Sequence, residues 1–279
     1  MPRQPGGHAM SPGFDASTPN MARVYDALLG GKDHYAADRA EAGRLLRIYP
    51  PLAAMARENR AFLARAITWA AQQGISQFID LGAGLPTAQN THQIARAVNP
   101  AAAVAYVDTD PVVLSHVRAL LAISDGLAAV AADLRDPAAV LADPELLAVI
   151  DPARPAAVIL GAVLHFTDAA AARQVTAGYA RLTAPGSCLI ISVACFDDEA
   201  LGKQLAAEYT AAQFVNHAPA DIASFLAGLD MIGPGLTEAR TWRPWMPAPA
   251  PSHRDGHVLA AVARPAPGQR TAPPATERR

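Results

Sequence analysis

Residues 77–87 read Gln-Phe-Ile-Asp-Leu-Gly-Ala-Gly-Leu-Pro-Thr, a short apolar strand that runs directly into a glycine turn. The next expected strand, 104–107, is followed at once by Asp108. A buried strand, a turn that lets the backbone approach a ligand, and a carboxylate at the end of the next strand are typical of a nucleoside-binding site. This stretch therefore predicts an α/β fold with a nucleoside at one edge of the sheet.

The details of the turn favour S-adenosylmethionine over a dinucleotide. Gly82 and Gly84 fill the first two positions of a dinucleotide fingerprint, but Thr87 occupies the third. Asp80 would repel a pyrophosphate, whereas it can face the ammonium of S-adenosylmethionine. The turn amides can face the carboxylate of that ligand, and Asp108 can accept both ribose hydroxyls. The alternative is that the turn only joins a strand to a helix in some other α/β protein.

The composition indicates a cytoplasmic protein with a sizeable core. The chain has 279 residues, 51% of them hydrophobic, and no apolar run reaches the roughly 18 residues that span a bilayer. The net charge of −2 gives no basic surface for a phosphate backbone. We therefore expect neither a membrane nor a nucleic-acid partner, and the oligomeric state is left open. Cys188 and Cys195 fall in one predicted strand on opposite faces, which indicates reduced, buried thiols.

Three helices are expected before the first strand, over 18–29, 36–48 and 52–73. Thr18 is the expected N-cap of the first, which ends at a pair of glycines. These helices define a predicted cap over 17–73, and the sheet domain follows over 74–264. The flanking segments 1–16 and 265–279 are rich in proline and small polar residues, and are predicted to be disordered.

Strands and helices then alternate, which predicts a doubly wound, mostly parallel sheet. The expected strands are 78–81, 104–107, 130–132, 157–164 and 188–194, with two weaker ones at 236–240 and 257–263. Ligands of such sheets bind at the carboxyl ends of the strands. The polar or turn residues at those ends are Asp80 with Gly82, Asp108, Asp133 and His165.

Two blocks of the sequence, residues 22–39 and residues 58–63 together with the glycine turn and 107–111, resemble a bacterial family of S-adenosylmethionine-dependent methyltransferases of undefined substrate. The resemblance runs from about residue 17 to 264. It implies a seven-stranded class I methyltransferase sheet with a reversed last strand and an N-terminal helical cap. It also implies that Asp133 with Leu134 contacts the adenine. The cofactor-binding residues predicted in all are Asp80, Gly82, Gly84, Thr87, Asp108, Thr109, Asp133 and Leu134.

The stretch Gly30-Gly31-Lys32-Asp33 admits three interpretations. A phosphate-binding loop is excluded, because no glycine precedes it at the needed spacing and Asp33 replaces the Ser or Thr that holds magnesium. A helix C-cap followed by a charged turn is the simplest interpretation. We favour a lid over the cofactor, because paired glycines can act as a hinge. Its predicted lid or substrate residues are Arg23, Tyr25, Lys32, Asp33, Tyr35 and Trp242.

His165 follows the fourth strand and is a candidate catalytic base, with a core histidine bonded to backbone as the alternative. Tyr25 is a second catalytic candidate. Trp242 either walls a substrate pocket or packs against the sheet. No metal site is predicted. The function that these patterns favour is in-line transfer of a methyl group from S-adenosylmethionine to a small molecule. A non-catalytic S-adenosylmethionine-binding or regulatory protein is the alternative, and a nicotinamide oxidoreductase is a more distant one.

Overall fold

The structure, a computed structural model, describes residues 15–86, 89–121, 124–245 and 254–266. Its strands form one sheet in the order β3-β2-β1-β4-β5-β8-β6, in which β1 to β5 are parallel and β8 is antiparallel. The predicted doubly wound sheet with a reversed last strand is confirmed, and a two-residue β7 pairs with β8 in addition. The strands are β1 (Gln77–Leu81), β2 (Ala103–Asp108), β3 (Leu127–Ala131), β4 (Ala157–Gly161), β5 (Cys188–Phe196), β6 (Leu229–Met231), β7 (Thr237–Glu238) and β8 (Gly256–Pro265).

Strand β5 lies in the interior of the sheet, and eight of its nine residues are buried. Such a continuous apolar run is what a strand covered on both faces requires. Cys188 packs in the hydrophobic cluster on one face and Cys195 in the cluster on the other, as predicted. Both thiols are free, and burial raises the pKa of each to about 12. They are therefore core residues without reactive thiolate character.

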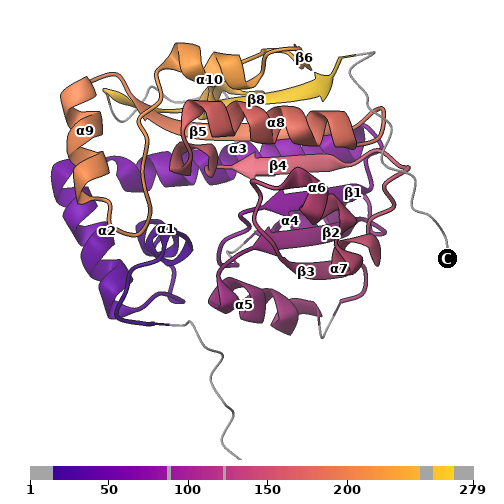
Figure 1. Cartoon of the computed structure of the whole chain (residues 1–279), viewed down its shortest axis with the longest axis horizontal. Coiled ribbons are helices and arrows are strands. Elements are labelled where there is room, and N and C mark those ends of the chain that lie inside the picture. The colour runs from indigo at the N-terminus through magenta and orange to yellow at the C-terminus, as the bar shows by residue number, and fades with distance from the viewer. Residues whose placement is uncertain (1–14, 87–88, 122–123, 246–253, 267–279) are drawn as a thin grey trace, which may run out of the picture.

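Helices cover both faces of the sheet, and three further helices lie beyond the carboxyl ends of its parallel strands (Figure 1). Among the described residues, none of the helices combines the length and the apolar character needed to cross a membrane. One face carries α3 (Leu52–Gln72), α4 (Thr91–Val98) and α5 (Pro111–Leu121), the other α6 (Pro137–Ala142), α7 (Pro144–Leu147), α8 (Ala169–Leu182) and α10 (Pro219–Phe225), and the strand ends face α1 (Met21–Leu29), α2 (Ala36–Ile48) and α9 (Glu199–Glu208).

Several boundaries differ from the predicted ones. Asn20 caps α1 in place of Thr18, because its side chain accepts the N–H of Ala22 at 2.8 Å. Strand β4 stops at Gly161, since Ala162 adopts a φ of +57° and turns the chain into a short 3₁₀ helix at Leu164–Phe166. The end of the sheet is predicted less well, because β6 is absent from the predicted strands and the predicted strand 236–240 contracts to the two residues of β7.

The connection between α1 and α2 is organised by one buried carboxylate. Asp26 accepts the N–H of Asp33 at 3.1 Å and lies 2.8 Å from Nδ1 of His34. Gly31 passes so close that a β-carbon there would meet the Asp26 carboxylate at 1.9 Å. Gly30 is left-handed, with a φ of +76°, and ends α1. The paired glycines therefore allow a tight turn around Asp26, which agrees with the helix C-cap interpretation of this stretch.

Candidate functional site

A cavity of about 370 Å³ lies where α1 and α3 meet the carboxyl ends of the parallel strands. This volume falls within the range of about 300–1,000 Å³ that is typical of small-molecule sites. Tyr25 of α1, Asn59 of α3 and residues that follow β1, β2, β4 and β5 line it. The topology therefore collects side chains that are far apart in the sequence into one chamber, as expected for a doubly wound sheet.

The glycine turn after β1 is fixed to the end of β2. Asp108 accepts the N–H of Gly84 at 3.0 Å through Oδ2 and the N–H of Asp110 at 2.9 Å through Oδ1. Gly82 and Gly84 both have positive φ angles, +64° and +65°, which glycine adopts without strain. A β-carbon on Gly82 would also meet Cγ1 of Val163 at 2.6 Å. Asp108 therefore both shapes the turn and lines the cavity, and its carboxylate retains lone pairs for a ligand.

Asp80 lies at the base of the same turn and lines the cavity. Its Oδ2 accepts the hydroxyl of Thr91 at 2.6 Å. Burial raises the pKa of Asp80 to about 6, and the nearby carboxylate of Asp108 acts in the same direction, while Arg60 opposes them. A carboxylate held in this way gains from a cationic ligand group, since a positive charge offsets the cost of burying the negative one.

The predicted adenine region follows β3. Asp133, Leu134 and Thr109 all line the cavity. The Asp133 carboxylate pairs with Arg135, whose Nε lies 2.9 Å from Oδ2, and this hydrogen bond lowers the pKa of Asp133. The pair is substantially exposed at the rim, so an incoming ligand can compete for it. Thr87, the remaining predicted cofactor residue, lies outside the described residues.

Tyr25 belongs to a hydrogen-bonded chain that joins four elements at the cavity wall. Its hydroxyl donates to the carbonyl of Ala56 at 3.0 Å and accepts from Nδ2 of Asn59 at 2.9 Å. Asn59 Oδ1 accepts the Ser192 hydroxyl at 2.6 Å, and Ser192 Oγ accepts the N–H of Ala162 at 3.0 Å. The chain therefore holds the strained Ala162 turn that aims the following residues at the cavity.

His165 sits in the 3₁₀ turn after β4, lines the cavity and is buried. Its Nδ1 accepts the backbone N–H of Ala194 at 3.3 Å. Burial, reinforced by nearby His217, lowers the pKa of His165 to about 3, so the ring is neutral at physiological pH. A neutral ring that accepts at Nδ1 carries its proton on Nε2. His165 therefore presents a hydrogen-bond donor to the cavity.

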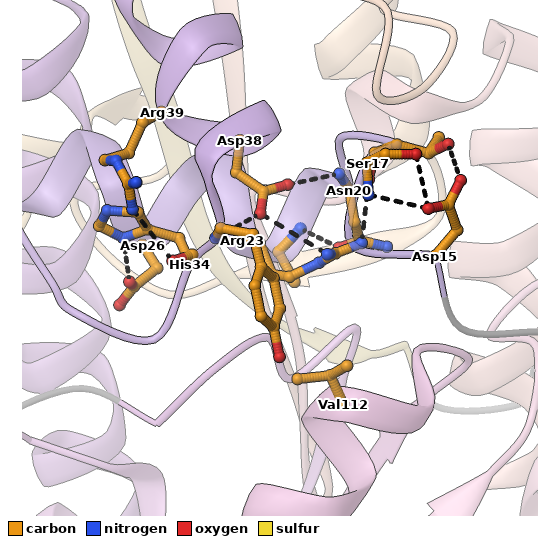
Figure 2. A network of polar contacts seen from close by, with 12 residues as sticks. Asp15, Ser17, Asn20, Arg23, Asp26, His34, Asp38, Arg39 and Val112 are labelled. Carbon is orange, nitrogen blue, oxygen red and sulfur yellow. Dashed lines mark hydrogen bonds and ion pairs between the residues drawn. The ribbon is translucent and has the colours of Figure 1, made fainter. Parts of the chain in front are cut away.

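Four of the predicted lid residues do not line the cavity. Arg23 is buried between Asp38 of α2 and Asp110, which precedes α5. Figure 2 shows its contact with Asp38. Tyr35 packs under that guanidinium, 5.3 Å from the ring centre, and is partly exposed. Lys32 is exposed, and Asp33 donates its N–H to Asp26. These residues shape the connection between α1 and α2 and hold it in place, and their role as lid residues stays a prediction.

Trp242 is also absent from the cavity wall. It is fully buried and packs edge-on against Phe62 and Trp69 of α3, with ring centres 5.5 and 6.3 Å away. Arg65 donates from Nε to the Trp242 carbonyl at 2.8 Å. Of the two interpretations of Trp242, packing on the sheet domain is the one that the structure supports.

The sequence patterns missed two kinds of cavity residue. The first is the polar pair Asn59 and Arg60 on α3, for which polar side chains on a helix that covers a sheet are the available signal. The second is a set of aromatic residues beyond β4 and β5, which includes Tyr209 and Phe214. These two follow α9 in an irregular segment, where no periodicity marks them.

The sheet order, the glycine turn after β1 and the acid that ends β2 together define a class I methyltransferase fold. The chain belongs to the S-adenosyl methyltransferase family, whose model matches residues 7–266. It is therefore an S-adenosylmethionine-dependent enzyme. This family membership favours the methyltransferase interpretation over that of a non-catalytic binding protein.

Two solved structures are similar over nearly the whole chain. A candidate methyltransferase from Thermobifida fusca YX is 40% identical, with a TM-score of 0.85 over 91% of this chain and 97% of that one. A DUF574 family protein from Streptomyces avermitilis MA-4680 is 34% identical, with a TM-score of 0.84 over 90% of this chain and 99% of that one. Among curated protein sequences, none is significantly similar to this chain.

Proposed function

We propose that this methyltransferase acts on a small molecule enclosed in the cavity between the cap helices and the sheet. The observation that carries the proposal is that one chamber contains both the acidic residues at the carboxyl ends of β1 and β2 and an uncharged wall around His165. A cofactor and a small acceptor can therefore lie next to each other inside the same enclosure.

The residues present suit S-adenosylmethionine. The proposed contacts place the cofactor ammonium at Asp80 and the ribose hydroxyls at Asp108, since both carboxylates face the cavity. The amides of Gly82 and Gly84 are proposed to face the methionine carboxylate, because left-handed glycines leave this backbone open to a ligand. Asp133 and Leu134 would then contact the adenine.

When bound, S-adenosylmethionine supplies an electrophilic methyl carbon, to which a lone pair of the acceptor forms a bond while the electrons of the broken C–S bond remain on sulfur. The protein has to align the acceptor and exclude water. The chain from Tyr25 through Asn59 and Ser192 fixes the wall of the cavity for this purpose. The Tyr25 hydroxyl donates a hydrogen bond to the Ala56 carbonyl, and burial raises the pKa of Tyr25, so the hydroxyl stays protonated.

We therefore assign His165 and Tyr25 to positioning the acceptor rather than to removing a proton. His165 Nε2 already carries a hydrogen, and Tyr25 stays protonated, so neither can take a further proton at neutral pH. Alignment in a dry site is the remaining source of rate enhancement, and well-oriented reactions gain about 7–11 kcal/mol in this way.

The test is transfer of a labelled methyl group. The purified protein is incubated with methyl-labelled S-adenosylmethionine and a small-molecule extract, and in parallel with total RNA and with denatured protein. Label in a low-mass product, together with S-adenosylhomocysteine, supports the proposal. The Asp108→Asn variant serves as a control with a weakened cofactor site. Label found in RNA or protein would refute the small-molecule acceptor and leave the methyltransferase activity established.

A further inference from the structure

The part of the cavity beyond β4 and β5 is lined by aromatic rings. The ring of Phe214 lies 5.4 Å from that of His165 and 6.3 Å from that of Tyr209, and Tyr209 lies 5.6 Å from Phe166. Phe196 completes the group, 6.1 Å from Phe214. These centre-to-centre distances are those of interacting aromatic pairs. We call these five residues the aromatic wall.

The segment that carries Tyr209 and Phe214 is held in place from α2. Glu41 is fully buried, and its Oε2 accepts the hydroxyl of Thr210 at 2.9 Å. Its carboxylate also accepts the Thr210 backbone N–H and pairs with Arg44. The rings thus belong to an anchored segment, and a fixed aromatic surface binds a rigid ligand at low entropic cost.

Charge is distributed unevenly around the cavity. Among the described residues, its charged lining side chains are Arg60 of α3, Asp80 of β1, Asp108 at the end of β2, and Asp133 with Arg135 after β3. These positions belong to the cofactor region. None of the charged lining residues comes from β4, β5 or the segment after α9, and Glu41 is not part of the lining. An anion placed against the aromatic wall would lose hydration without gaining a partner.

The aromatic wall nevertheless offers one directed polar group. Nδ1 of His165 is occupied by the N–H of Ala194, which leaves the Nε2 hydrogen as a donor in the cavity. The neighbouring His217 is held by the backbone, since its Nε2 donates to the carbonyl of Thr167 at 3.0 Å. A ligand that offers an acceptor atom satisfies the His165 donor, and one that lacks it leaves a buried donor unmet.

We propose that the methyl acceptor is an uncharged, planar aromatic compound with a hydrogen-bond-accepting atom, which packs on Phe166 and Phe214 and accepts from Nε2 of His165. This proposal rests on the proposed function and specifies its substrate class. It also constrains the reaction. An attacking atom that carries a proton has to release it to water. An aromatic ring nitrogen other than the atom bound to His165 attacks through its own free lone pair, and the positive charge then moves from sulfur to the product.

The experiment compares three bicyclic probes of similar size. Isoquinoline is aromatic, uncharged and carries a ring nitrogen, 2-naphthoate is aromatic but anionic, and 2-decalone is uncharged with an acceptor oxygen but is not aromatic. Each is titrated into the full-length protein by calorimetry, with and without saturating S-adenosylhomocysteine. We expect isoquinoline to bind about twofold to tenfold more tightly than 2-decalone, the range that an aromatic contact contributes, and at least about fivefold more tightly than 2-naphthoate, whose buried charge lacks a partner. Equal or tighter binding of 2-naphthoate or of 2-decalone would overturn the proposal.

Two variants test the named contacts. His165→Phe keeps a ring but removes the donor, and Phe214→Leu removes a ring, so each should weaken isoquinoline binding about threefold to tenfold. Trp245→Leu is the matched control, because Trp245 is 71% exposed and does not line the cavity. Unchanged isoquinoline affinity in both variants would refute the site.

The affinity for S-adenosylhomocysteine distinguishes a failure of this proposal from a failure of the proposed function. It should be unchanged in all three variants, which also verifies that they fold. If wild-type protein fails to bind S-adenosylhomocysteine, the cofactor assignment fails, while the order of the three probes measured without it still decides the acceptor class.

Discussion

Nε of Arg23 in α1 lies 3.7 Å from Oδ2 of Asp110, at the entrance to α5. Asp110 in turn donates its backbone N–H to Asp108, the proposed ribose ligand. The guanidinium also lies 3.6 Å from Asp38 of α2 (Figure 2). All three side chains are nearly inaccessible to solvent. Arg23 thus joins the two cap helices to the end of β2 through buried charges.

Removal of Arg23 should destabilise the fold strongly. Arg23→Met leaves two buried carboxylates with less compensation, and loss of one partner of a buried pair costs about 3–5 kcal/mol. The Arg23→Met/Asp110→Asn double variant should lose less than the sum of the single variants, because the second change removes one of these carboxylates. Urea unfolding measures all three. Arg39→Met is the control, since Arg39 is exposed and should change stability by less than about 0.5 kcal/mol. Additive losses would show that Arg23 and Asp110 do not interact.

Cofactor affinity should depend on the ionisation of Asp80. Its pKa of about 6 in the free protein means that it is mostly protonated at pH 5, and an ammonium group requires the carboxylate. The dissociation constant of S-adenosylhomocysteine should therefore rise about tenfold between pH 7.5 and pH 5. The other charged groups that face Asp80 are Arg60 of α3 and Asp108 of β2. Asp80→Asn should bind more weakly at pH 7.5 and should lose most of the pH dependence, and a variant that retains the full dependence would exclude Asp80 as its source.

The stability of the free protein should depend on the pKa of Asp80 in the opposite direction: ionisation of Asp80 at higher pH favours cofactor binding but disfavours folding. Because burial raises the pKa of Asp80 in the folded state, folded Asp80 holds its proton more tightly than the unfolded chain does. Its favourable contribution is therefore complete below the unfolded pKa near 4, and is lost as the pH rises through about 6. The change in stability caused by Asp80→Asn should accordingly be more favourable at pH 7.5 than at pH 4. Thermal unfolding of the variant and of wild-type protein at the two pH values would measure this difference.

The glycine turn offers a matched pair of substitutions. Gly82→Ala faces both a positive φ and a contact of 2.6 Å with Val163, whereas Gly84→Ala faces the same φ with its nearest atom, Cβ of Ala22, at 4.0 Å. Left-handed backbone at alanine costs about 1–2 kcal/mol. Gly84→Ala should lose about that amount, and Gly82→Ala more, because Val163 or the turn has to move. If chemical unfolding shows equal losses of unfolding free energy in the two variants, the Val163 side chain moves aside without a free-energy cost.

The parts of the fold that could be predicted from the sequence are those that local pattern determines. The strand that ends at Asp80, the turn at Gly82 and the acid at Asp108 lie within short segments whose spacing reflects one strand–turn–helix geometry. The buried run of β5 was equally clear from its unbroken apolar character.

What sequence reasoning missed depends on contacts between distant segments. The sequence alone allows Trp242 to line a pocket, whereas its packing against Phe62 places it in the core. Phe214 joins His165 only because the segment after α9 folds back over β4 and β5. The role of Arg23 likewise requires Asp110, which belongs to a different part of the chain. No periodicity in a single segment carries this information.

Replacement of Asp108 should weaken cofactor binding more than replacement of Asp133. Asp108→Asn keeps the shape of the side chain but removes the charge, and a hydrogen bond to a charged group contributes about 1.5–3 kcal/mol. The dissociation constant of S-adenosylhomocysteine should rise roughly tenfold to over a hundredfold. Asp133→Asn should have a smaller effect, because the Asp133 carboxylate is partly exposed and already engaged by Arg135.

A ligand that lacks one ribose hydroxyl shows whether Asp108 acts through the ribose. The 2′-deoxy analogue of S-adenosylhomocysteine should bind wild-type protein more weakly than the parent compound, because one hydroxyl no longer reaches the carboxylate. In Asp108→Asn the difference between the two ligands should shrink, since the charged acceptor is already gone. Calorimetric titration of both ligands into both proteins completes the cycle. If the deoxy analogue loses the same affinity in both, Asp108 supports the glycine turn through Gly84 and does not hold the ribose.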